Sequence, residues 1–134
     1  MSDKIEKLVQ IQSFEGDGKL TLVNGYDKTG FTLNHQKIDG PVLLFPRDYT
    51  SWSPLNAAEP SADEWLALLG DYKPPLILFG TGGAPTSPYP KLRAALSAAG
   101  FALEVLSTAS ACRTWNVLIS EKRDVAGFFL PVGR

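Results

Sequence analysis

Short apolar runs separated by turn-forming residues fill the first third of the chain. Residues 8–11, 20–23 and 31–33 are such runs, and glycine, asparagine and aspartate lie between them. Apolar stretches of this length, bounded by turn residues, are typical of β-strands, so the pattern predicts three strands joined by turns. Asn24-Gly25 is predicted to be one of these turns, because both residues tolerate a positive φ angle.

Two further runs are apolar without interruption. Residues 42–45 lie between Pro41 and Pro46, and residues 76–79 follow a pair of prolines. A continuous apolar run suits a strand that is covered on both faces, and prolines are tolerated at strand ends. We therefore predict two central strands here, and antiparallel β-structure for most of the first 46 residues.

The second half of the chain alternates between helical and strand patterns. Ser61 and Glu64 match a capping box, in which each side chain bonds the other residue's backbone N–H, and this predicts a helix that ends at Gly70. Further helices are predicted at residues 88–99 and from Ser107 or Thr108 to residue 120, and strands at 101–106 and 125–130. Such alternation predicts a sheet with helices packed on it.

Composition sets the broad class of the protein. With 134 residues and 44% hydrophobic side chains, we expect one domain over residues 1–134, with an ordered core over about residues 8–131. The 13 basic and 14 acidic residues leave a net charge of −1, which argues against a nucleic-acid partner. One cysteine fits a reducing compartment. No apolar run approaches the roughly 18 residues of a membrane span, and no targeting signal is visible, so we expect no membrane insertion and a cytoplasmic location.

The turn Gly80-Thr81-Gly82-Gly83 is the first candidate site, because it joins an apolar strand to a helix, where backbone N–H groups can hold an anion. It does not match the nucleotide fingerprints, since Pro85 stands where the dinucleotide motif needs its third glycine. A tight turn that brings strand and helix together is the favoured interpretation, and anion or small-ligand binding is the alternative.

The helix containing Cys112, Arg113, Thr114 and Asn116 is the second candidate site, together with Arg123 beyond its end. Cys112 is expected to be a buried structural residue, because a nucleophilic cysteine needs a base and the sole histidine is His35, in a turn-like context. One cysteine and one histidine also cannot supply a zinc site, so neither a metal nor a cofactor is expected. Thr114 and Asn116 either bond a neighbouring backbone or line a cleft with Arg113 that faces the glycine turn.

Four segments, taken in order, carry a resemblance to a known family: residues 30–32 (GFT), 40–44 (GPVLL), 76–82 (LILFGTG) and 111–118 (ACRTWNVL), the last followed by 121–126 (EKRDVA). The chain resembles the small α/β domain family of the mitochondrial respiratory complex I assembly factor three type, the Mth938-like domain of unknown function. The resemblance is to the bacterial branch, because no transit peptide is seen. Trp115 stands where Tyr or Phe is commoner in the family.

The resemblance implies an α/β (α+β) fold with a central mixed sheet, helices packed on it, and additional N-terminal antiparallel β-structure. It also implies a pocket near the glycine turn and the Cys112 helix, without an established catalytic residue. For the mitochondrial member it implies a protein-assembly role through association with other proteins.

Two functions are compatible with these observations. The favoured one is a non-enzymatic interaction protein that assists assembly of a respiratory or membrane-associated complex, with Tyr49, Trp52 and Leu55 exposed to a protein partner. The alternative is a small-molecule or anion-binding protein, or an enzyme. Its pocket would combine these nine residues: Gly80, Thr81, Gly82, Gly83, Cys112, Arg113, Thr114, Asn116 and Arg123.

Overall fold

The computed structural model describes residues 18–56 and 58–133. The strands in this part of the chain are β1 (Val23–Tyr26), β2 (Gly30–Leu33), β3 (Gln36–Asp39), β4 (Val42–Phe45), β5 (Asp48–Ser51), β6 (Leu76–Thr81), β7 (Ala102–Leu106) and β8 (Val125–Leu130). The helices are α2 (Ala62–Leu69), α3 (Pro90–Ala98) and α4 (Thr108–Ser120). The strand predicted at residues 8–11, and the first residues of the predicted core, lie outside the described residues.

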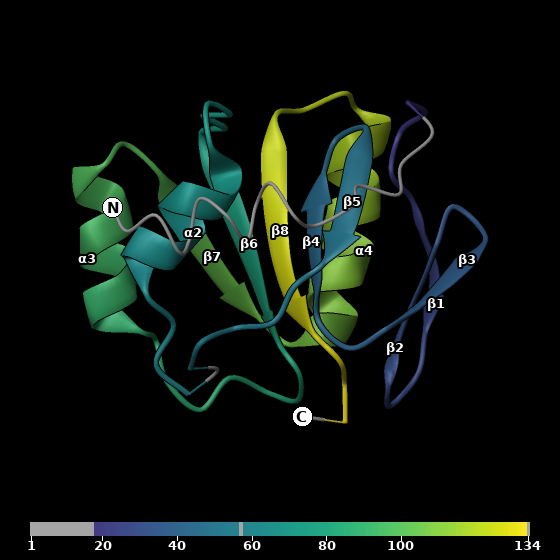
Figure 1. Cartoon of the computed structure of the whole chain (residues 1–134), viewed down its shortest axis with the longest axis horizontal. Helices are drawn as coiled ribbons and strands as arrows, with labels where there is room; N and C mark the ends of the chain where they lie inside the picture. The colour runs from purple at the N-terminus through teal and green to yellow at the C-terminus, as the bar shows by residue number, and fades with distance from the viewer. Residues whose placement is uncertain (1–17, 57, 134) are drawn as a thin grey trace.

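The strands form two sheets (Figure 1). The first is antiparallel, with the order β1-β2-β3, and the second is mixed, with the order β5-β4-β8-β6-β7. In the second sheet, β6 pairs in parallel with β7 and β8, whereas β4 pairs antiparallel with β5 and β8. The predicted α/β class, with a central mixed sheet and extra antiparallel β-structure, is confirmed. No described helix is long and apolar enough to cross a membrane.

Alternate residues of the central strands supply two separate hydrophobic layers. Ile77, Phe79 and Phe128 face the layer that contains α2 and α3. Leu78 and Phe129 face the opposite layer, which contains α4 and the small sheet. Because both faces are covered, β4, β6 and β8 consist almost wholly of buried apolar residues, as their uninterrupted sequence runs predicted.

The layer under α2 is an aromatic cluster. Trp65 stacks on Phe128 with ring centroids 3.9 Å apart, and Trp52 lies edge-on to both rings. Trp115 lies in the opposite layer, edge-on to Phe129. All three tryptophans are buried.

Gly80 lets α4 approach the central sheet closely, and Gly127 leaves room for the Phe129 ring of its own strand. A Cβ atom on Gly80 would stand 3.0 Å from Thr108 Oγ1 and 3.3 Å from the Ala111 Cβ, and one on Gly127 would stand 2.9 Å from the Phe129 ring. A larger side chain at position 80 would push α4 away from β6, whereas one at position 127 would first displace the Phe129 ring. Gly80, singled out above as part of a ligand turn, is therefore needed for packing.

Side chains of α4 also fasten the small sheet to the rest of the protein. The Asn116 amide pairs with the Val23 backbone, accepting from its N–H at 2.9 Å and donating to its carbonyl at 2.8 Å. The Trp115 indole N–H donates to the Thr21 carbonyl at 2.9 Å. Asn116 thus completes the outer edge of β1 as a neighbouring strand would, which is the backbone-bonding alternative left open for this residue.

Three predictions in the first half are wrong. The strand predicted at residues 20–23 shares only Val23 with β1. Asn24-Gly25 is not a turn but lies inside β1, which begins at Val23 and has a register shift between Val23 and Gly25. The turn falls later, where the Asp27 carboxylate accepts from the N–H groups of Thr29 and Gly30. The residues that permit a turn also permit a β-bulge, and here the pairing with β2 decides between them.

The proposed exposure of Tyr49 and Trp52 is also wrong. Residues 48–51 form β5, which pairs with β4, so Tyr49 is 1% exposed and Trp52, directly after the strand, is 2% exposed. Of the three residues named, only Leu55 is exposed, at 57%. The short strands β3 and β5 were missed because their sequences, QKID and DYTS, contain no apolar run.

Most of the second half matches the sequence prediction within two residues. Strand β8 has the predicted bounds, and α4 begins after Ser107, whose hydroxyl accepts from the Ser110 N–H. Only half of the predicted capping box forms at α2. The Ser61 hydroxyl accepts from the Glu64 N–H at 3.4 Å, but the Glu64 carboxylate accepts from the Leu55 N–H at 3.0 Å instead of returning to Ser61.

Glu64 is consequently a buried carboxyl group, 2% exposed, that fixes the loop after β5 onto α2. Burial raises its pKa above the ordinary value, and the Leu55 N–H opposes this rise in part. The Trp52 indole also opposes it, although its N–H does not reach hydrogen-bond geometry. A raised pKa in the folded state means that the folded protein holds this proton more tightly than the unfolded chain does.

We expect Asn116→Ala to lower the free energy of unfolding by about 1–3 kcal/mol, because it removes two hydrogen bonds and leaves both backbone groups of Val23 unpaired. Urea unfolding measures this loss. Val117→Ala, on the exposed side of the same helix, is the control and should change stability by less than about 0.5 kcal/mol. Equal effects of the two substitutions would show that Asn116 does not hold the small sheet.

Glu64→Gln tests the buried carboxyl group through pH. Because the folded-state pKa is raised, the contribution of Glu64 to stability is complete below the unfolded-state pKa and is lost as pH rises through the folded-state pKa. Glutamine stays neutral and can still accept from Leu55. The free energy of unfolding of the variant should therefore equal that of the wild type near pH 4 and exceed it near pH 7. The excess should be about 1.4 kcal/mol for each tenfold difference in proton affinity of Glu64 between the folded and unfolded states.

Denaturant unfolding at both pH values gives this comparison. Glu104→Gln is the matched control, because Glu104 is exposed on β7. A stability difference between Glu64→Gln and the wild type that does not change with pH would contradict the assignment.

Candidate functional site

The order of the central strands creates a crevice at one end of the sheet. From β6 the chain passes through α3 to β7 on one side, and then through α4 to β8 on the other side of β6. In sheets of this kind, the strand order reverses at one point, where the chain has been added first on one side of a strand and then on the other. The crevice outside the carboxyl ends of the two parallel strands at that point is the usual place for a ligand. Here that place lies beyond Thr81 of β6 and Leu130 of β8.

A hollow of about 350 Å³ lies at this point. We call it the switch-point groove, and it is lined by Ala58, Thr81, Gly83, Ala84, Thr86, Tyr89 and Leu130. A neighbouring hollow of about 380 Å³ shares Ala58, Thr86 and Tyr89 with it and continues along the start of α3. The glycine turn therefore does border a cavity, although not the one that the sequence predicted.

Tyr89 forms the wall common to both hollows. Its backbone is left-handed, with φ 50° and ψ 60°, directly before Pro90 begins α3. For a non-glycine residue this conformation costs roughly 1–2 kcal/mol, so other interactions must hold it. The Ser87 hydroxyl accepts from the Tyr89 N–H at 2.9 Å, and the Tyr89 ring lies edge-on to Phe79 with centroids 5.0 Å apart. These contacts fix the aromatic ring in the groove wall.

Hydrogen bonds within the protein tie the glycine turn to the start of α4. The Gly82 N–H donates to Thr108 Oγ1 at 2.8 Å, and the Thr108 N–H donates back to the Gly82 carbonyl at 3.0 Å. The Thr108 hydroxyl in turn donates to the Leu130 carbonyl at 2.6 Å. Since Thr108 is fully buried and already satisfies the Gly82 amide, that amide does not serve an anion. The favoured interpretation of the turn, close approach of strand and helix, matches this geometry.

The structure distributes the remaining predicted residues along α4. Cys112 lies in the hydrophobic layer beneath the helix, and Asn116 is engaged by Val23. Arg113 lies on the exposed side and donates to the Ser110 hydroxyl at 3.1 Å, next to the half-exposed Thr114. Arg123 follows the opposite end of the helix from the glycine turn, about 20 Å away for 13 helical residues. One small ligand therefore cannot contact the whole predicted set.

The groove offers neutral polar groups rather than reactive ones. The Thr81 hydroxyl lies 2.9 Å from the Gly83 carbonyl and 3.2 Å from the Leu106 carbonyl, which leaves Thr86 and Tyr89 as the side chains with a hydroxyl to offer a ligand. No cluster of three metal-ligating side chains occurs within residues 18–56 and 58–133. The arrangement suits the binding of a small polar group, and the described lining residues of the groove include no acid–base pair.

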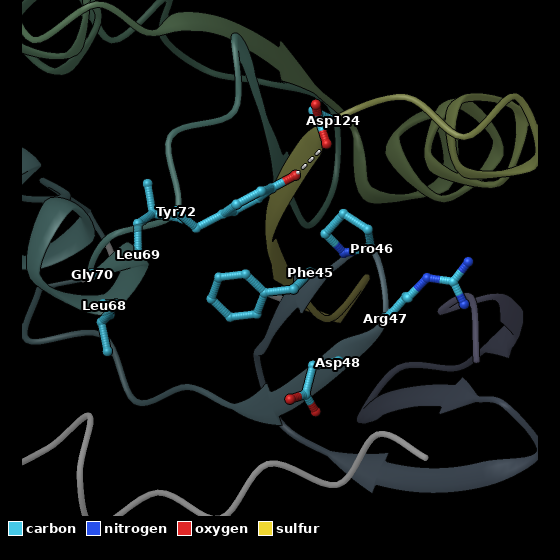
Figure 2. Close-up of a pocket in the computed structure, with 9 residues that line it drawn as sticks. All are labelled: Phe45, Pro46, Arg47, Asp48, Leu68, Leu69, Gly70, Tyr72 and Asp124. Carbon is cyan, nitrogen blue, oxygen red and sulfur yellow. Dashed lines mark hydrogen bonds between the residues drawn. The ribbon is translucent and has the colours of Figure 1, made fainter. Parts of the chain in front are cut away.

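Sequence reasoning missed a second and larger hollow, which lies on the α2 side of the sheet (Figure 2). We call it the Phe45–Tyr72 hollow; its volume is about 560 Å³ and its lining is Phe45, Pro46, Arg47, Asp48, Leu68, Leu69, Gly70, Tyr72 and Asp124. The rings of Phe45 and Tyr72 meet edge-on at 5.9 Å and form its apolar part. These residues come from three separate segments, so no sequence spacing could have grouped them.

Asp124 sets the electrostatics at the edge of this hollow. The Tyr72 hydroxyl donates to its carboxylate at 3.4 Å. Burial, followed by the negative charge of Asp124, raises the pKa of Tyr72 to about 12, so the phenol stays protonated at neutral pH. The hollow thus presents two aromatic rings beside a carboxylate.

Cys112 should be unreactive in the folded protein. Burial raises the pKa of its thiol to about 12, and the nearby positive charge of Arg113 offsets this rise only in part. Only the thiolate reacts with disulfide reagents, so labelling at pH 8 should proceed on the timescale of unfolding and become fast in denaturant. Fast labelling of the native protein would instead indicate an accessible, activated cysteine.

Comparisons with known proteins agree on one family. The family described as "Protein of unknown function (DUF498/DUF598)" matches residues 23–130. The NADH dehydrogenase [ubiquinone] 1 alpha subcomplex assembly factor 3 of Xenopus tropicalis is 27% identical over 132 residues, which is 96% of this chain and 72% of the frog protein. The mouse protein of the same name is 27% identical over 111 residues, 81% of this chain and 60% of its own length.

Solved structures share the fold. A crystal structure of a Bordetella parapertussis protein superposes with a TM-score of 0.76 at 27% identity, covering 86% of this chain and 98% of that one. A solution structure of a Bordetella pertussis Mth938-like domain gives a TM-score of 0.71 at 23% identity, covering 84% of this chain and 87% of that one. The fold is therefore that of an Mth938-like domain. Because the family match extends from β1 through β8, this chain belongs to the DUF498/DUF598 family.

Proposed function

We propose that this chain is a non-enzymatic protein that assists the assembly of a respiratory complex by binding a protein partner. The observation that carries the proposal is the similarity, over most of the chain, to proteins named as assembly factors of NADH dehydrogenase. The chemistry of the site supports it, because the switch-point groove offers hydroxyl groups without an acid–base pair and Cys112 is buried.

The Phe45–Tyr72 hollow is the surface that suits such a partner. Aromatic rings at the centre of a contact, surrounded by polar groups, are typical of the residues that dominate protein–protein affinity. The rim carries the carboxylates Asp48 and Asp124, and the Arg47 guanidinium points away from the hollow (Figure 2). We therefore assign to it a partner segment with an apolar side chain next to a basic one, which would lie beside Asp124.

The alternative function, binding of a small molecule or anion at the glycine turn, has less support in the geometry. The Gly82 amide is satisfied by Thr108, and Arg123 follows the far end of α4. What supports a ligand there is the location of the switch-point groove at the carboxyl ends of β6 and β8. Such a ligand would be small, polar and uncharged.

Deletion of the gene in its source organism tests the assembly role. We expect less fully assembled NADH dehydrogenase on native gels and lower NADH oxidation by membranes, with both restored by the wild-type gene. Tyr72→Ala should restore them poorly, because loss of an aromatic anchor costs about 2 kcal/mol of binding, roughly thirtyfold in affinity.

Tyr26→Ala is the matched control, since Tyr26 is 41% exposed on β1, away from this hollow, and it should restore assembly fully. Thermal unfolding of both variants establishes that they are folded. Normal amounts of the complex after deletion would refute the assembly role, and full restoration by folded Tyr72→Ala would refute the docking surface.

A further inference from the structure

A third hollow, of about 600 Å³, lies beside the small sheet. We call it the Lys19–Arg47 hollow, and its lining is Lys19, Leu20, Leu22, Asn24, Asn34, His35 and Arg47. These residues come from the segment before β1, from β1 itself, and from the β2–β3 and β4–β5 turns.

The charged side chains among the described lining residues are of one sign. Lys19 and Arg47 line the hollow, together with the imidazole of His35, and none of the described lining residues is a carboxylate. The whole chain has a net charge of −1, so the concentration of cations is a local feature and not a consequence of a basic protein. Arg47 donates one N–H to the Gly18 carbonyl at 3.0 Å, and a guanidinium carries four further N–H groups.

The two asparagines add donors rather than acceptors. Asn34 Oδ1 accepts from the Leu22 N–H at 2.7 Å, and Asn24 Oδ1 accepts from the His35 N–H at 2.6 Å. With both amide oxygens engaged, the NH₂ groups are what these side chains have left to offer a ligand. Cations and amide donors in one hollow match the acceptor oxygens of a phosphate or a carboxylate.

Backbone contacts hold the walls of the hollow in place. The Asn34 N–H donates to the Leu22 carbonyl at 3.0 Å, and the Thr21 N–H donates to the Pro46 carbonyl at 2.8 Å. Asn34 and His35 form the β2–β3 turn with φ angles of 48° and 69°. Glycine is the favoured second residue of such a turn, so His35 occupies a position that the backbone conformation disfavours for histidine.

We propose that the Lys19–Arg47 hollow binds a small organic anion through its phosphate or carboxylate groups. Lys19 and Arg47 supply the charge, while Asn24, Asn34 and His35 supply hydrogen-bond donors. Leu22, which is 38% exposed at the same hollow, contacts the carbon part of the ligand. The proposal is independent of the assembly role, because it uses a different hollow.

Titration of the ¹⁵N-labelled protein with pyrophosphate and with citrate tests it, with sodium chloride added to keep ionic strength constant. We expect saturable shifts confined to the amides of residues 20–24, 34–35 and 47. Saturation by pyrophosphate alone assigns a phosphate ligand, and saturation by citrate alone assigns a carboxylate ligand. Shifts that are scattered, do not saturate, or appear equally with sodium chloride would overturn the proposal.

Variants locate the binding. The double variant Lys19→Ala/Arg47→Ala should weaken binding at least tenfold, and Lys73→Ala/Arg123→Ala, which removes the same charge elsewhere, should leave it unchanged. His35→Gly relieves the turn of its non-glycine positive φ, so the variant is expected to fold, and it should also bind more weakly. Equal weakening by the two double variants, or unchanged binding by His35→Gly, would show that this hollow is not the site.

Discussion

The close packing of α4 against β6 and β8 is the constraint on which the rest of the structure depends. It favours glycine at position 80, because a side chain there would crowd Thr108 and Ala111 of the helix. Once the helix is that close, Trp115 and Asn116 reach beyond it to the backbone of Thr21 and Val23. These two side chains, presented from a helix held at that distance, help to fix the position of the small sheet.

This packing explains why the most distinctive sequence motif is not a catalytic site. Ala111 fits over Gly80, Cys112 fills the hydrophobic layer, and Asn116 pairs with β1. A run of polar and reactive residue types in one helix suggests chemistry when only the sequence is considered. In the fold, each of these residues faces a different neighbour, and the polar atoms of Asn116 complete hydrogen bonds that a missing strand would otherwise supply.

The sequence predicted the elements that depend on local chemistry, and failed where distant segments decide. Strand β8 and helix α4 follow from an apolar run and from the Ser107 cap, both of which are readable over a few residues. Strand β5 depends on pairing with β4, which no pattern within DYTS reveals. The prediction of the site failed for the same reason. The sequence correctly placed Cys112 and Arg113 on one helix, but it did not show that Thr108 occupies the Gly82 amide or that Arg123 follows the far end of that helix.

The β4–β5 turn explains how a nearly neutral chain presents two surfaces of opposite character. Arg47 borders both the Phe45–Tyr72 hollow and the Lys19–Arg47 hollow, yet its guanidinium reaches the Gly18 carbonyl and so belongs to the second. The described lining of the first hollow includes the carboxylates of Asp48 and Asp124 beside its aromatic rings. The β4–β5 turn therefore separates the carboxylates at the first hollow from the cations at the second. The first surface is acidic and apolar and suits a basic protein segment, and the second is basic and suits an anion. The hydrogen bond from Arg47 to the Gly18 carbonyl holds the guanidinium at the second hollow, and so keeps its positive charge away from the first.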